Sequence, residues 1–138
     1  MFTTECFIRK NTKKLQKQLE NIGYHICICA KWGDSIWLDN LIMNGTIHGI
    51  GYFDSYITNI TSQSEALKEF ELTTTKIDCG KNEQLFLALC SLRDDTDKYQ
   101  WFTDGTLWER CESDLPSKYM QMHGHKASVE EIINYFKK

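Results

Sequence analysis

The chain has 138 residues, of which 41% are hydrophobic, 12% aromatic and 25% charged, and its formal net charge is −3. This length and composition exclude an intrinsically disordered chain and are typical of one globular domain with a substantial core. The acidic balance disfavours a dedicated nucleic-acid-binding protein, whose surface is usually basic. We therefore expect a single domain over residues 1–138.

The charge is unevenly distributed along the chain. Residues 1–31 carry six basic and two acidic side chains, a local balance of +4, which leaves −7 for the remainder. Such asymmetry can orient a protein partner or a second copy of the chain. Nucleic-acid binding stays an alternative that predicts strong salt dependence. It would use the basic residues Lys10, Lys13, Lys14 and Lys17.

No leader peptide or membrane span is expected. The start, MFTTECFIRK, lacks a basic segment followed by an apolar run, and no stretch approaches about 18 apolar residues. We therefore expect a cytoplasmic protein with no membrane partner. In that compartment its six cysteines are expected to be reduced thiols.

In the first half, a short strand is expected at Cys6–Arg9, followed by a helix that Asn11 or Thr12 caps and Gly23 ends. Tyr24–Lys31 alternates like a strand, and the turn residues Gly33 and Asp34 predict that it pairs with a strand at Ile36–Asp39.

Asn44 and Gly45 follow, between the apolar segments 41–43 and 46–48. Asn-Gly between apolar segments is a strong hairpin signal, because both residues tolerate positive φ.

The second half begins with a strand at Lys76–Cys79 and a helix from about Asn82 to Arg93 that is apolar nearly all round, which predicts a buried helix. A hairpin joins Tyr99–Thr103 to Thr106–Cys111, and its turn residues Asp104 and Gly105 suit a tight type I′ turn.

The last part of the chain is predicted to be irregular over residues 112–124 and then helical. Ser128 and Glu131 form a capping box at the start of the final, amphipathic helix.

These elements predict an α+β fold with a mostly antiparallel sheet, built from hairpins and covered by about three helices. The two halves also suggest a weak internal pseudo-repeat, since each reads as a helix followed by a strand pair containing tryptophans.

Three stretches carry a resemblance to known sequences: CFIRKNTKKLQKQLENIGY, IDCGKNEQLFLALCSLRDDTDKYQWF and HKASVEEIINYF. Together they resemble a group of small uncharacterised proteins of gut Bacteroidales and their phages. The resemblance implies a bacterial cytosol and transfers no activity or site residue. Residues 34–70 are the most individual part of the chain, and a variable segment there can set the choice of partner.

The best metal candidates are His25, Cys27 and Cys29, which share one face of the predicted strand. Structural zinc sites usually use Cys-x₂₋₄-Cys spacing, which this segment lacks. Buried thiols are the competing interpretation, and no cofactor is expected.

Cys79 is the strongest candidate nucleophile in the sequence. It precedes the helix that starts near Asn82, and the partial positive charge of a helix start can lower a thiol pKa. The same helix start can hold an anion, or it can be a plain cap.

Binding candidates come from a loop and a hairpin. Asp94, Asp95 and Asp97 form an acidic cluster without the full ligand series of a calcium loop. Trp101 and Trp108 each neighbour an apolar residue on the opposite face of a strand, so they either mark a binding surface or are covered by helices on both faces.

The sequence contains no catalytic signature. It favours a small binding protein that recognises a protein partner or a second copy of itself. The alternative is a ligand- or anion-binding protein, or a thiol-dependent enzyme, that uses Cys79 and the helix start near Asn82.

Overall fold

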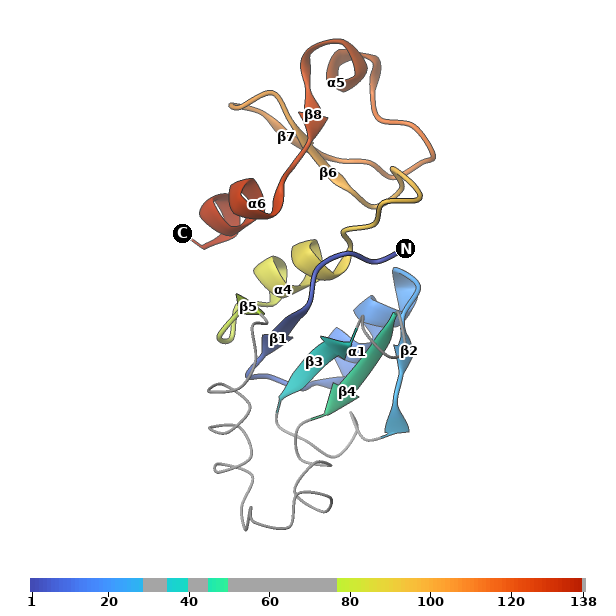
Figure 1. Ribbon diagram of the computed structural model, residues 1–138, viewed down its shortest axis with the longest axis vertical. Coiled ribbons are helices and arrows are strands. Elements are labelled where there is room, and N and C mark those ends of the chain that lie inside the picture. Colours follow the sequence, from blue (N-terminus) through green and yellow to red (C-terminus); the bar gives the residue numbers. More distant parts are fainter. Residues whose placement is uncertain (29–34, 40–44, 50–76, 138) are drawn as a thin grey trace.

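The computed structural model describes residues 1–28, 35–39, 45–49 and 77–137. These residues form an α+β fold with four helices and two mostly antiparallel sheets (Figure 1). The larger sheet has the strand order β2-β4-β3-β1-β5, and the smaller has the order β7-β6-β8. This confirms the predicted fold class, with one helix more than expected.

The larger sheet is mixed. Strand β1 (Cys6–Ile8) pairs antiparallel with β3 (Ile36–Asp39) and parallel with β5 (Ile77–Asp78). On the other side of β3, strand β4 (Thr46–Gly49) pairs antiparallel with β3 and parallel with β2 (His25–Ile26). The sheet therefore places β1, β3 and β4 in its interior and β2 and β5 at its edges.

The predicted pairing of Tyr24–Lys31 with Ile36–Asp39 is wrong, because β4 lies between β2 and β3. The residues of β3 from Ile36 to Leu38 are all buried, which suits an interior strand, whereas His25 of β2 is exposed and suits an edge. The predicted turn at residues 33–34 lies outside the described residues. Since β2 and β3 are not a pair, the expected repeat of helix and strand pair in the two halves is also wrong.

The expected hairpin before β4 has a different first strand. Strand β4 pairs with β3, from Asp39 opposite Thr46 to Ile36 opposite Gly49. Gly45 has the predicted positive φ of 83°. The segment 41–43, expected as the first strand, lies outside the described residues, as does most of the variable region 34–70 apart from β3 and β4.

Helix α4 (Glu83–Cys90) occupies the centre of the fold, between the two sheets (Figure 1). It contacts β1, helix α1 (Lys13–Asn21) and helix α6 (Val129–Phe136). Contacts on so many sides explain its nearly uniform apolar surface and confirm the expected buried helix. Its buried residues are Leu85, Phe86, Ala88, Leu89 and Cys90.

The smaller sheet consists of β6 (Trp101–Thr103), β7 (Trp108–Arg110) and β8 (His125–Lys126). Trp101 and Trp108 pack against the main core, which includes α6. Phe102 faces the other way and forms a second cluster with Cys111 and Met120. Helices therefore cover both faces of β6. This is the second of the two interpretations given above for Trp101 and Trp108, in which helices pack on both faces of the strand.

The turn between β6 and β7 is wider than predicted. Thr103 lies opposite Trp108, so residues 104–107 form the loop and the type I′ prediction is wrong. Asp104 accepts hydrogen bonds from the amides of Thr106 (2.9 Å) and Leu107 (2.8 Å), and this side-chain turn replaces a tight backbone turn.

The region predicted to be irregular contains helix α5 (Lys118–His123). Ser117 caps this helix by accepting from the amide of Met120, whose own side chain is buried in the second cluster. A six-residue helix after Pro116 is too short for its periodicity to be recognised in the sequence.

The helix ends follow their local signals. Thr12 caps α1 by accepting from the amide of Leu15 at 3.1 Å, and Gly23 beyond the helix has a φ of 112°. Ser128 and Glu131 form the predicted capping box of α6. None of the described helices has both the length and the apolar character needed to cross a membrane.

Candidate functional site

A cavity of about 690 Å³ lies between α1, α4, α6 and the β6–β7 hairpin. Ligand pockets in proteins are typically about 300–1,000 Å³, so its size fits a small organic molecule. Its lining residues are Gln18, Asn21, Ile22, Gln84, Leu87, Ala88, Ser91, Trp101, Arg110, Tyr135 and Phe136.

The spacing of residues along α1 and α4 explains how each helix forms one wall of the cavity. On α1, residues 18, 21 and 22 lie on one face because they are three and four positions apart. On α4, residues 84, 87, 88 and 91 repeat the same spacing over two turns. Each helix thus presents amide and apolar side chains to the space between them.

The hairpin and α6 supply the aromatic wall. Trp101 of β6 lies directly opposite Arg110 of β7, so both side chains leave the same face of the sheet. The Trp101 ring meets the Phe136 ring edge-on, with centroids 5.2 Å apart. Beside them, Trp108 stacks on Tyr135 at 4.2 Å and an angle of 14° between the planes. These ring contacts fix the orientation of the wall.

Arg110 is the one charged side chain among the described residues that line the cavity. Its guanidinium lies 5.1 Å from the centroid of the Tyr99 ring, and its Nη1 is 3.4 Å from Oε1 of Glu112. This ion pair is a single long contact to an exposed carboxylate, which carries little energy. The one charge on the described cavity wall is therefore positive.

Three side-chain amides face the same space, those of Gln18, Asn21 and Gln84. None of them makes a hydrogen bond to another described residue. Amide side chains offer both donors and acceptors, so they can meet polar groups of a bound molecule.

Comparisons with known protein families, curated proteins and solved structures found no match for this chain.

Only one of the two predicted tryptophan sites belongs to the cavity. Trp101 lines it, whereas Trp108 lies behind the wall, stacked on Tyr135. Trp108 therefore supports the site through Tyr135 and does not face the space itself.

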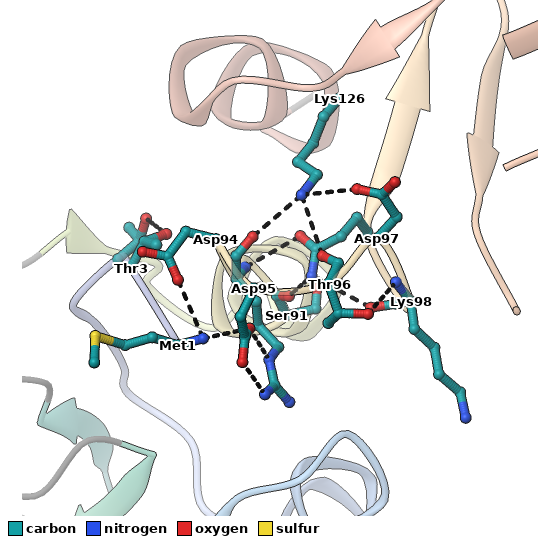
Figure 2. A network of polar contacts seen from close by, with 12 residues as sticks. Met1, Thr3, Ser91, Asp94, Asp95, Thr96, Asp97, Lys98 and Lys126 are labelled. Carbon is teal, nitrogen blue, oxygen red and sulfur yellow. Dashed lines mark hydrogen bonds and ion pairs between the residues drawn. The ribbon is translucent and has the colours of Figure 1, made fainter. Parts of the chain in front are cut away.

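The acidic residues Asp94, Asp95 and Asp97 lie away from the cavity, and each pairs with a cation (Figure 2). Asp94 and Asp95 contact the amino group of Met1, and Lys126 lies 3.1 Å from Asp97. Arg93 donates two hydrogen bonds to Asp95, of 2.8 and 2.9 Å, and holds the pKa of that carboxyl below its usual range.

These pairs give the acidic loop a structural role. Lys126 also donates to the backbone carbonyls of Arg93 and Thr96, both at 3.2 Å, so β8 is tied to the loop after α4 (Figure 2). The described residues contain no group of three or more side chains suited to hold a metal ion.

Cys79, the candidate nucleophile, is buried beside two other thiols. Its hydrogen bond with Cys6 and its burial raise its pKa, whereas the helix start was expected to lower it. Cys6 in turn lies 3.5 Å, sulfur to sulfur, from Cys90. A thiol held in its protonated form is a poor nucleophile.

The helix start near Asn82 is also occupied. Asn82 accepts from the amide of Leu85 at 3.1 Å, and Asp78 accepts from the amide of Gly80 at 2.8 Å. The amide of Leu85, one of those that an anion would use here, thus has a protein acceptor, as a plain cap provides.

The proposed metal ligands are not brought together as far as the structure describes them. His25 is exposed on the edge strand β2, and Cys27 is half-buried just beyond it. Cys29 lies outside the described residues.

Arg110, Gln18 and Gln84 are site residues that the sequence did not single out. One signal was present: Arg110 alternates with Trp108 in the predicted strand and so shares its face. The amides carried no such signal, because Gln18 lies on the amphipathic helix α1, where polar residues usually face solvent, and Gln84 is an exposed residue of α4.

Proposed function

We propose that this protein is a non-catalytic binding protein that takes a small organic ligand in the cavity between α1, α4, α6 and the β6–β7 hairpin. The observation that carries the proposal is the cavity wall, in which aromatic rings, one cation and several amides converge on about 690 Å³. Ligand sites usually combine apolar and aromatic side chains with a few placed polar groups, and this wall holds both kinds.

The chemistry of the wall supports binding over catalysis. General acid–base catalysis needs a group that titrates near the working pH, most often histidine or a carboxylate. No such residue is among the described residues that line the cavity. Ser91 does line it, but its hydroxyl is buried and donates to the carbonyl of Ala88 at 2.8 Å.

The cellular setting is part of the proposal. The resemblance to small proteins of gut Bacteroidales and their phages supports a role in a bacterial cytosol.

Occluding the cavity tests the proposal. Isothermal titration of the protein with a panel of small aromatic compounds should find binders, and Gln84→Trp should weaken them by about tenfold or more because the bulky side chain fills the space. Lys17→Trp is the matched control, since Lys17 is exposed on α1 and does not line the cavity. A panel without binders, or equal affinity in both variants, would contradict the proposal.

A protein partner or self-association is the second candidate function. It is favoured by large exposed apolar side chains on and around α5, including Leu115 (66% exposed) and Met122 (76%). Self-association should appear as a dimer in sedimentation equilibrium and should be lost in Met122→Lys. A monomer at all concentrations would exclude self-association.

A further inference from the structure

The charge of the cavity restricts what can bind in it. Arg110 is the one charged residue of the described wall, and its contact to the carboxylate of Glu112 is a single one at 3.4 Å. Arg93 shows the contrast, because it forms a two-bond pair with Asp95 at 2.8 and 2.9 Å. Arg110 thus retains the donor pair that a planar anion would use.

Arg110 is also positioned before any ligand arrives. The ring of Tyr99 lies 5.1 Å from its guanidinium carbon, within the range of a cation–π contact. A guanidinium held in this way loses less side-chain entropy on binding than a mobile one. Arginine binds carboxylate and phosphate groups through two parallel hydrogen bonds.

The aromatic wall lies next to this cation. Trp101 is the direct cross-strand neighbour of Arg110, and Phe136 packs edge-on against it. Tyr135, fixed by stacking on Trp108, extends the wall and remains 42% exposed. Flat rings of a ligand gain most from such a surface, because aromatic pairs add to the energy of simple burial.

We infer that the ligand is an aromatic anion, a flat ring joined to a carboxylate or phosphate, with the ring on Trp101 and Phe136 and the anionic group on Arg110. This inference rests on the proposed function and names the class of ligand. The amides of Gln18, Asn21 and Gln84 then meet the remaining polar groups of the molecule.

Two probes that share one ring system, one of them charged and the other neutral, separate the effect of the charge on affinity from that of the ring. We expect indole-3-propionate to bind about tenfold tighter than its neutral amide, indole-3-propionamide, when both are titrated calorimetrically. Phenyl phosphate forms the second arm and distinguishes a preference for phosphate from one for carboxylate.

Three variants test whether the preference for the acid depends on Arg110. Arg110→Gln should remove the difference between acid and amide. Lys98→Gln should keep it, because Lys98 lies over the same Tyr99 ring at 5.1 Å but does not line the cavity. Arg110→Lys keeps the charge without the planar donor pair, so it should retain only part of the difference.

The results of these titrations distinguish a failure of the ligand class from a failure of the ligand site. Equal affinity of acid and amide for the wild-type protein overturns this inference but leaves the proposed ligand site intact. Binding of neither probe nor phenyl phosphate, together with no binder in the wider panel, overturns both. The comparison on the wild-type protein decides the matter even if a variant fails to fold.

Discussion

Asp104 joins the β6–β7 loop to helix α5 through both of its carboxylate oxygens. Oδ1 accepts from the amides of Thr106 and Leu107, and Oδ2 accepts from the hydroxyl of Tyr119. Hydrogen bonds to the charged form lower the pKa of Asp104 to about 2, and the same contact raises the pKa of Tyr119. One side chain therefore connects two elements that the sequence does not place together.

The lowered pKa of Asp104 predicts how the stability of the fold depends on pH. The pKa of Asp104 is about 2 in the folded protein, while an unfolded aspartate has about 4. Ionised Asp104 therefore stabilises the fold above about pH 4, and this contribution is lost as the pH falls towards 2. In urea unfolding, the wild-type protein should be more stable than Asp104→Asn at neutral pH, and the gap should close in acid.

The difference in unfolding free energy between the wild-type protein and Asp104→Asn reports on Asp104, because all other carboxylates titrate in both proteins. Asp114→Asn is the control, since Asp114 is exposed and makes no hydrogen bond to another described residue. A gap for Asp104→Asn that stays constant between neutral pH and about pH 2 would contradict the assignment.

At the scale of elements, the structure separates what local signals determine from what they do not. The cap residues Thr12 and Ser128 were predictable, because each acts on amides within its own first turn. The pairing of β2 with β4 was not, since the order of strands depends on contacts between distant segments. Helix α5 was missed because its six residues present only one buried side chain, Met120.

The candidate site was predictable to a smaller degree. Trp101 was named from its position on a strand, but the cavity exists only because α1 and α6 are packed on either side of α4. No pattern within a single element shows which polar faces will meet across such a space. Arg110 and the amides of α1 and α4 therefore became site residues only through the tertiary structure.

The cap of α6 gives a prediction at this scale. Ser128→Ala removes the acceptor of the Glu131 amide, and loss of such a cap costs about 1 kcal/mol of unfolding free energy. Ser128→Thr keeps a hydroxyl and should lose much less. Chemical denaturation of the wild-type protein and both variants measures the loss of unfolding free energy. A Ser128→Ala variant as stable as the wild-type protein would contradict a stabilising cap at Ser128.

At the scale of the whole molecule, three thiols mark the junction of its parts. Cys6 lies on β1, Cys79 follows β5 and Cys90 ends α4, and all three are buried. Burial raises the pKa of Cys6 and of Cys90, and a hydrogen bond with Cys6 together with burial raises the pKa of Cys79. Exposing them requires the larger sheet and α4 to separate, which amounts to unfolding the core.

Thiol labelling tests this directly. In native buffer Cys6, Cys79 and Cys90 should resist alkylation, while the half-buried Cys27 should react faster than these three. When urea is added, the labelling of Cys6, Cys79 and Cys90 should follow the global unfolding curve. Peptide mapping by mass spectrometry measures this labelling. Alkylation of Cys79 in native buffer at the rate of Cys27 would contradict the buried cluster and revive a reactive thiol.

Nuclear magnetic resonance shows whether a ligand binds in the cavity or elsewhere on the protein. On titration with indole-3-propionate, we expect shifts of the Trp101 indole N–H, the Arg110 side-chain N–H and the Gln84 side-chain amide, which all belong to the cavity wall. Unchanged signals from these three groups, with shifts confined to other parts of the chain, would show that the ligand binds elsewhere and that the cavity is not the functional site.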